Sequence, residues 1–118
     1  MTVDAATAAG YGDRPASRQL RLISWKHVLS GRLRGFATVE ITSIGLRIVD
    51  VPVLTGDNGP WATVPEKPAL DRDGKRRLDV NGRPEWAPVV EWTSRELRQG
   101  FSDAVVAAVR RAHPGDLD

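Results

Sequence analysis

Apolar and polar residues alternate along the first half of the chain, which is the pattern of β-strands with one buried face. Leu20–Val28 is rich in β-branched and aromatic residues, and Ser30-Gly31 separates it from a similar segment, Leu33–Ile41. Turn-forming residues between two such segments are typical of a hairpin. We therefore expect the first two strands to pair with each other.

A valine-rich segment, Ile44–Leu54, predicts the third strand. Alternation divides its residues between two faces, with Val49, Val51 and Val53 on one face and Ile48, Asp50 and Leu54 on the other. Pro52 has no N–H to donate to a neighbouring strand. We therefore expect it at a sheet edge or at a bulge.

Two shorter strands are predicted after this segment. Asn58-Gly59 favours a type I′ turn, because both central residues of that turn need positive φ. Trp61–Val64 is then the returning strand, and Glu85–Trp92 predicts a short last strand.

The C-terminal part of the chain changes to helical periodicity. Thr93 opens the sequence T-S-R-E, which is the pattern of a capping box. In this motif the Thr93 side chain accepts a hydrogen bond from the backbone N–H of Glu96, and the Glu96 side chain accepts one from the backbone N–H of Thr93. Apolar residues then recur on one stripe, namely Leu97, Phe101, Ala104, Val105, Ala108, Val109 and Ala112. The turn formers His113-Pro114-Gly115 end the helix. The sequence thus predicts an α+β fold, an antiparallel β-sheet of about five strands packed by one C-terminal α-helix.

One folded domain is expected, between two tails. Residues 1–19 are rich in Ala, Gly and Thr and lack periodicity, so we expect a disordered N-terminal tail. The domain covers residues 20–113, and residues 114–118 form a C-terminal tail. Residues 66–84 are dominated by charge and by Pro and Gly, which predicts a long exposed basic loop. We identify no internal repeat.

Composition narrows the function classes. The chain has no cysteine, which excludes disulfides, thiolate catalysis and cysteine-based metal sites. Without a secretory signal or an apolar run of membrane-spanning length, we expect a cytoplasmic protein and no membrane partner. His27 and His113 are far apart, and no Ser-His-acid or metal-ligand spacing occurs. We predict no enzyme, no cofactor and no metal, with an enzyme subunit dependent on His27 as a weaker alternative.

Charge distribution indicates where a polyanion could bind. The 17 cations and 15 acids give a net charge of +2. Six cations and no acid lie between Arg14 and Arg34, whereas the cations of the predicted loop are interleaved with aspartates. Arginine predominates over lysine, which suits bidentate phosphate contacts, although a GC-rich genome would give the same bias.

Three segments of the chain, in this order, resemble the septation protein SpoVG family (stage V sporulation protein G). They are GRLRGFATVEI (Gly31–Ile41), IVDVPVLTGDNGPWATVPEKP (Ile48–Pro68) and TSRELRQGFSDAVVAAV (Thr93–Val109). The resemblance implies a small α+β fold, a homodimer joined through its sheets, and site-selective DNA or RNA binding in gene regulation.

The chain departs from the family pattern in its middle. The family passes through a short P-D-G turn into F-R-D-I-A-H-P-I, whereas Ala69–Asn81 resembles an insertion and the histidine is absent. Pro68 and Pro52 stand where the family tends to carry basic residues. Phosphate contacts at those two positions would be lost, and the basic insertion either compensates or serves another partner.

Nine cations are candidate phosphate ligands. Arg32 and Arg34 match basic positions of the family's second strand, and their spacing of two places them on one strand face. Lys67 matches the family's basic position after V-x-x-P. Arg95 and Arg98 are neighbours on the helix surface near its N-terminus, or pair instead with Glu91, Glu96 or Asp103. The loop adds Lys75, Arg76, Arg77 and Arg83. Ordinary solvated surface is the alternative for each.

The four tryptophans have two interpretations. Aromatic side chains flanked by cations stack on the bases of single strands. Packing is the alternative, and we expect Trp25, Trp86 and Trp92 in the core and Trp61 packed on its strand.

Taken together, these observations predict a cytoplasmic, dimeric, SpoVG-like nucleic-acid-binding regulatory protein that contacts DNA, and possibly RNA, through phosphates. The alternative is a protein-interaction module on the same scaffold, whose basic loop binds an acidic partner.

Overall fold

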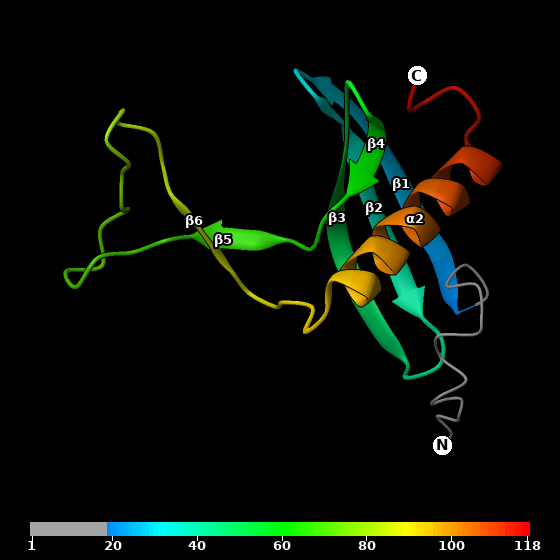
Figure 1. Cartoon of the computed structure of the whole chain (residues 1–118), viewed down its shortest axis with the longest axis horizontal. Helices are drawn as coiled ribbons and strands as arrows, with labels where there is room; N and C mark the ends of the chain where they lie inside the picture. Colours follow the sequence, from blue (N-terminus) through cyan, green and yellow to red (C-terminus); the bar gives the residue numbers. More distant parts are fainter. Residues whose placement is uncertain (1–18) are drawn as a thin grey trace.

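The computed structural model describes residues 19–118, which form an antiparallel sheet, one helix and a projecting arm. The four strands of the sheet lie in the order β1-β2-β3-β4, with bounds Leu20–Ser30, Leu33–Ile41, Leu46–Gly56 and Gly59–Ala62. Helix α2 (Arg95–Ala112) crosses one face of this sheet, and β5 (Glu66–Pro68) and β6 (Trp86–Pro88) pair in the arm, away from the sheet (Figure 1). The predicted α+β class is confirmed.

The last predicted strand does not join the main sheet. Within Glu85–Trp92 only β6 is extended, and it pairs with β5, where Lys67 lies opposite Ala87. Prolines at both ends of β5 and β6 remove donors, which keeps this ladder short. The sheet therefore has four strands, and the predicted fifth belongs to the arm.

A β-bulge in β3 changes which side chains face the core. Ala37 pairs with Val51 and Val39 pairs with Ile48, so two residues of β3 lie opposite one residue of β2. The bulged Asp50 has φ 57°. The extra residue reverses the alternation, because side chains beyond a bulge change faces. Ile48 consequently packs against the core and Val49 is 58% exposed, so the predicted grouping of Val49 with the buried valines is wrong.

Pro52 lies in an inner strand, but it is two residues from this bulge and beyond the last residue of β3 that pairs with β4, which agrees with the predicted position at an edge or a bulge. Its carbonyl oxygen accepts a hydrogen bond from Thr63 N at 3.2 Å. A residue in a strand directs its N–H and C=O to the same side, so the missing N–H faces the point where β4 has ended at Ala62. No strand there needs the donor.

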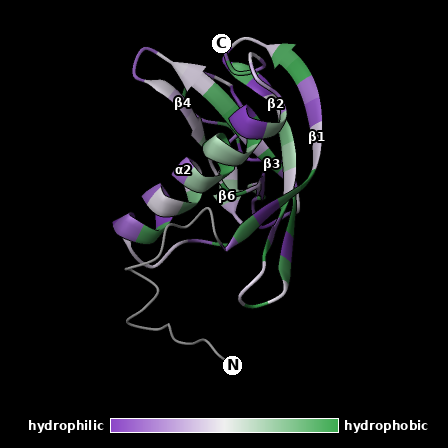
Figure 2. Ribbon diagram, turned by 90° about the vertical axis from the view of Figure 1, so that its right-hand side faces the viewer, coloured by the Kyte–Doolittle hydropathy of each residue, from purple (hydrophilic) through white to green (hydrophobic). Residues whose placement is uncertain are grey.

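The core lies between α2 and the sheet. Alternate sheet residues and one stripe of the helix are fully buried, chiefly Val39, Val51, Val53, Val105 and Val109. Bands of apolar and polar residues alternate along β1 (Figure 2). Trp25 and Trp92 are half-buried against this core, as predicted. Ser102 is also buried, and its Oγ accepts a hydrogen bond from Ala62 N of the edge strand β4 at 2.9 Å.

Helix α2 begins one residue later than the capping box predicted. Its N-cap is Ser94, whose Oγ accepts a hydrogen bond from Leu97 N at 3.1 Å. Thr93 therefore stands outside the helix. Glu96 lies in the first turn, where a carboxylate favours the positive end of the helix dipole.

Ser94→Ala is expected to lower the free energy of unfolding by about 1 kcal/mol, because it leaves the N–H of Leu97 without its acceptor. Thr93→Ala is the matched control, and we expect a change of no more than about 0.5 kcal/mol because the residue is exposed and outside the cap. Urea denaturation of both variants measures the difference. Equal losses would argue against Ser94 as the cap.

Residues at both predicted tails belong to the folded body. Leu117 is only 2% exposed, and Asp116 Oδ2 accepts a hydrogen bond from Trp25 Nε1 at 2.8 Å. At the other end, Gln19 is buried and its carbonyl accepts from Thr42 N at 2.7 Å. The domain therefore extends beyond residues 20–113 at both ends. The prediction for the first eighteen residues, including Arg14, lies outside the described range.

Candidate nucleic-acid interface

The charged segment between β5 and β6 begins with a hairpin closed by an aspartate. Leu70 and Arg76 form an isolated β-bridge. Within this bridge, Asp71 Oδ1 accepts hydrogen bonds from the backbone N atoms of Asp73 (2.8 Å) and Lys75 (3.0 Å). An aspartate that binds nearby backbone N–H groups in this way forms an Asx turn, which fixes the loop without any core.

A second hairpin repeats the same arrangement eight positions later. Leu78 and Pro84 form the bridge, and Asp79 Oδ1 accepts from the backbone N atoms of Asn81 (2.8 Å) and Arg83 (3.0 Å). The two hairpins share the pattern L-D-x-[D/N]-G-[K/R]. The expectation that the chain has no internal repeat is therefore wrong. The repeated Asp and Gly would have shown it in the sequence.

The two hairpins and the β5–β6 pair meet in a cyclic set of three backbone hydrogen bonds. Ala69 N donates to Glu85 O, Arg77 N to Ala69 O, and Glu85 N to Arg77 O, each at 2.9 Å. The arm consequently ends in a fork, with its two turns pointing away from each other (Figure 1). We call residues 66–88 the forked arm.

Four cations of the forked arm, Lys67, Arg72, Lys75 and Arg83, are exposed and form neither an ion pair nor a cation–π contact with any residue in the range 19–118. Lys75 and Arg83 occupy equivalent places, each directly after the glycine of its turn, and Lys67 lies in β5. The backbone of each turn is held by its aspartate. These ammonium and guanidinium groups are therefore presented to solvent on a defined frame.

The other two loop cations are engaged within the arm. Arg77 Nε lies 3.2 Å from Glu85 Oε1, so part of its charge is compensated. The Arg76 guanidinium lies over the ring of Trp86, 5.5 Å from the ring centroid, a cation–π arrangement that leaves its charge in place.

Arg95 and Arg98 lie in the first turns of α2, close to where the forked arm returns to the body. Neither forms an ion pair with another described residue, so the predicted pairing with neighbouring carboxylates is not observed. Arg98 lines a cavity of about 250 Å³ together with Glu66 and Pro88 at the base of the arm. The structure therefore brings Arg98 to the base of the arm, and no arm cation lines this cavity.

Arg32 lies in the turn between β1 and β2 and Arg34 in the first residues of β2, so neither belongs to the arm. Arg34 is half-buried, and its Nη1 donates to the carbonyl oxygens of Gly31 (2.9 Å) and Leu33 (3.1 Å). Arg32 precedes β2 and lies in the turn, so strand alternation does not place the two on one face. Arg34 stabilises the turn, and Arg32 is the exposed member of the pair.

Trp86 differs from the expectation of packing, whereas the Trp61 ring lies against Gly56 of β3. Trp86 is 56% exposed on the arm, so its assignment to the core is wrong, and Trp61 is 37% exposed. Trp86 stands in a short strand that lies away from the main sheet, which explains why apolar character did not lead to burial.

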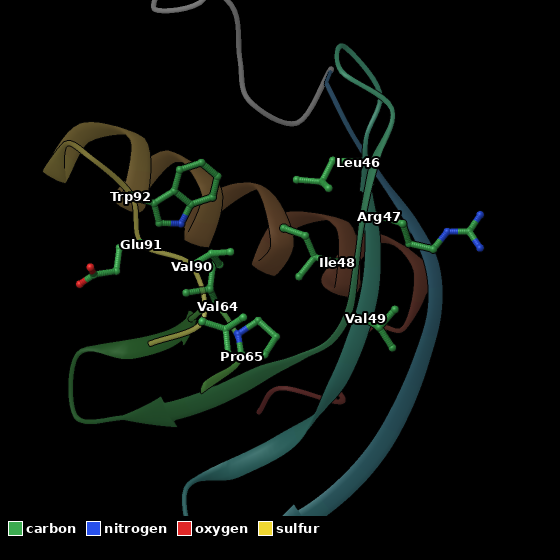
Figure 3. A pocket seen from close by; sticks show the side chains of 10 residues that line it. Leu46, Arg47, Ile48, Val49, Val64, Pro65, Val90, Glu91 and Trp92 are labelled. Carbon is green, nitrogen blue, oxygen red and sulfur yellow. The ribbon is translucent and has the colours of Figure 1, made fainter. Parts of the chain in front are cut away.

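An apolar cavity of about 320 Å³ lies on the helix side of the molecule (Figure 3). Ile48, Val64 and Trp92 contribute to its wall, and Trp92 packs on the ring of Phe101 with centroids 5.1 Å apart. The charged side chains at its rim, Arg47 and Glu91, point away from the space. The buried Nε1 of Trp92 finds no hydrogen-bond acceptor among the described residues, and neither Arg47 nor Glu91 points into the space to act as an acid or base.

The remaining titratable groups form no further centre. His27 Nδ1 lies 3.7 Å from Asp116 Oδ2, which already accepts the Trp25 hydrogen bond. Between residues 19 and 118, three possible metal ligands do not come together at any point. In the same range, no helix combines the length and the apolar character needed to cross a membrane.

The chain matches no protein-family model and no curated protein. The SpoVG resemblance therefore stays a prediction that rests on the residues quoted above.

Proposed function

We propose that the chain is a SpoVG-like nucleic-acid-binding regulatory protein that grips phosphates with the exposed cations of its forked arm. The observation that carries the proposal is the placement of Lys67, Lys75 and Arg83 on a projecting, rigidly turned frame. Phosphate contacts of this kind supply affinity that is independent of base sequence.

The state of the acids on the arm supports this proposal over an ordinary solvated loop. Asp71 and Asp79 each accept two backbone hydrogen bonds, and Glu85 is paired with Arg77. The two aspartates hold the turns and form no ion pair with the nearby cations. They keep their negative charge, so the six cations and five acids of residues 66–88 leave a net charge of only +1, and the exposed, unpaired cations are what favours a polyanion.

The proposal includes a homodimer. Apolar side chains are exposed on β3, on the arm and directly after it, among them Leu46, Val49, Val80 and Val89. Leu46, Val49 and Val89 line the same cavity, and exposed apolar residues that lie together favour an association surface. Two protomers would also double the phosphate contacts available to one strand of nucleic acid.

Salt dependence tests the proposal and the dimer together. With three phosphates bound per protomer, log Kd plotted against log salt changes with a slope of about 5 for a dimer and about 3 for a monomer. Fluorescence anisotropy of a labelled oligonucleotide at several salt concentrations measures the slope, and sedimentation equilibrium gives the oligomeric state. A slope near zero would contradict binding through phosphates.

A protein partner is the second candidate, because the arm also exposes apolar residues. Leu70 and Leu78 are more than half exposed, and Val80 is fully exposed. This candidate predicts that deletion of Ala69–Asn81 abolishes capture of an acidic protein while nucleic-acid affinity stays unchanged. The nucleic-acid proposal predicts the loss of that affinity.

A further inference from the structure

A cavity of about 570 Å³ lies between the forked arm and the face of the sheet that α2 leaves uncovered. Phe36, Pro52 and Leu54 form its floor, since they alternate with the buried residues that face the helix. Trp86 of β6 lines it from the arm. Its size lies within the range of sites that bind small organic groups.

The apolar part of this cavity suits an aromatic ring. Trp86 and Phe36 offer two aromatic side chains from different elements, and Pro52 is a flat apolar neighbour. The Arg76 guanidinium lies against Trp86 and adds positive charge at the arm side. Aromatic side chains flanked by cations are the arrangement on which bases of single-stranded nucleic acid stack.

Two carboxylates determine which polar groups of a ligand the cavity favours. Asp50 and Glu66 both line it. Ionised carboxylates only accept hydrogen bonds, so they favour a ligand edge that carries N–H donors and repel a phosphate. The cavity therefore suits a base, while the phosphates of the same strand stay outside it near the arm cations.

Alternation places Asp50 on the same face as Pro52 and Leu54, and the β3 bulge falls at this residue. Asp50 has φ 57°, a conformation that is uncommon outside glycine, and its N–H donates to Thr38 Oγ1 at 3.3 Å. Bulges re-aim side chains next to binding sites, and strained backbone is concentrated at such sites. Lys26 Nζ lies 3.1 Å from Asp50 Oδ1 and offsets part of its charge on one side.

We propose that this cavity binds one unpaired nucleobase, with a preference for guanine. Guanine presents two adjacent donors, N1–H and N2–H, on its Watson–Crick edge, which suit the acceptor oxygens of Glu66 and the Asp50 oxygen that Lys26 leaves free. Thymine and uracil present a single N–H between two carbonyl groups, which the carboxylates repel. In a duplex this edge is already paired, so the cavity selects single strands. The inference rests on the proposed nucleic-acid function and specifies its ligand.

The test compares three probes in anisotropy titrations with the full-length protein. They are a ten-nucleotide thymidine strand, the same strand with one central guanine, and the duplex of the latter. We expect the guanine strand to bind about tenfold more tightly than the thymidine strand, the size of one bidentate base contact. The duplex should bind less tightly than the guanine strand.

Substitutions at Asp50 and Trp86 assign the preference to the cavity. Asp50→Asn, which tolerates positive φ, is expected to remove the tenfold difference and leave the salt slope unchanged. Asp50→Gly has the same expected effect on base preference, and its backbone suits the bulge, so it guards against misfolding of the first variant. Trp86→Leu should weaken guanine-strand binding about tenfold, and Trp61→Leu, also an exposed tryptophan, should not.

The outcomes separate this inference from the function on which it rests. Salt-dependent binding of all three probes with equal affinity would overturn the base site and leave the phosphate grip standing. A Trp86→Leu variant that changes only the dimer dissociation constant would also overturn the base site and leave the phosphate contacts standing, because a second copy of the chain would then occupy the cavity. Failure of every probe to bind would overturn the proposed function itself.

Discussion

Replacement of Lys67, Lys75 and Arg83 together by glutamine is expected to lower nucleic-acid affinity about 500-fold in 0.1 M salt for each protomer that contacts the strand. Each lost phosphate contact reduces log K by about 0.9 at this salt concentration, and three contacts are removed. The three side chains are exposed and make no ion pair with another described residue, so the fold should be unaffected. Anisotropy titrations and thermal unfolding measure the two effects.

A matched variant distinguishes binding by the forked arm from binding that depends only on the net charge of the protein. Arg47, Arg110 and Arg111 are also exposed, and their replacement by glutamine removes the same charge from outside the arm. We expect this control to weaken binding less than about fivefold, since distant exposed charges are largely screened at 0.1 M salt. Equal losses in the two triple variants would show that net charge, and not the forked arm, binds the nucleic acid.

Gly35→Ala is expected to lower the free energy of unfolding by about 3 kcal/mol or more, because the added methyl group has no space. A Cβ at this position would lie 2.3 Å from Lys26 O and 2.6 Å from Trp25 Cη2. The first of these atoms belongs to the paired strand and cannot move without breaking the β1–β2 ladder. Urea denaturation measures the loss.

Gly31→Ala is the control for this prediction. Gly31 has φ +58° in the β1–β2 turn, and no atom lies within 4 Å of the added Cβ. The expected loss is therefore only the conformational cost of about 1 kcal/mol. If Gly35→Ala were no less stable than Gly31→Ala, the close crossing of Trp25 over Gly35 would be wrong.

The order of the elements could be predicted from the sequence because each depends on local chemistry. Turn formers and alternation determined the first hairpin, and periodicity determined α2. The bulge at Asp50 could not be predicted, because it depends on the register between β2 and β3 and not on the residues of β3 alone. The same reason explains why the sequence pattern predicted the wrong face for Val49.

The sequence predicted the residue types of the candidate site, but it did not predict the contacts that these residues make. The sequence identified the cations, but it could not show that Arg77 pairs with Glu85 or that Arg34 binds its own turn. Those contacts depend on which backbone segments meet. Trp86 was misassigned because the burial of an apolar residue is decided by its tertiary neighbours, and the arm carries it away from the main sheet.

The cyclic junction of the forked arm has a consequence for how such a chain can change in length. Excision of residues 70–77 would join Ala69 to Leu78, and Ala69 and Glu85 would then exchange both hydrogen bonds of an ordinary antiparallel pair. The fork would become a single ribbon with one aspartate turn. Duplication of eight codons would reverse this step, so the arm can gain or lose a branch while the body keeps its register.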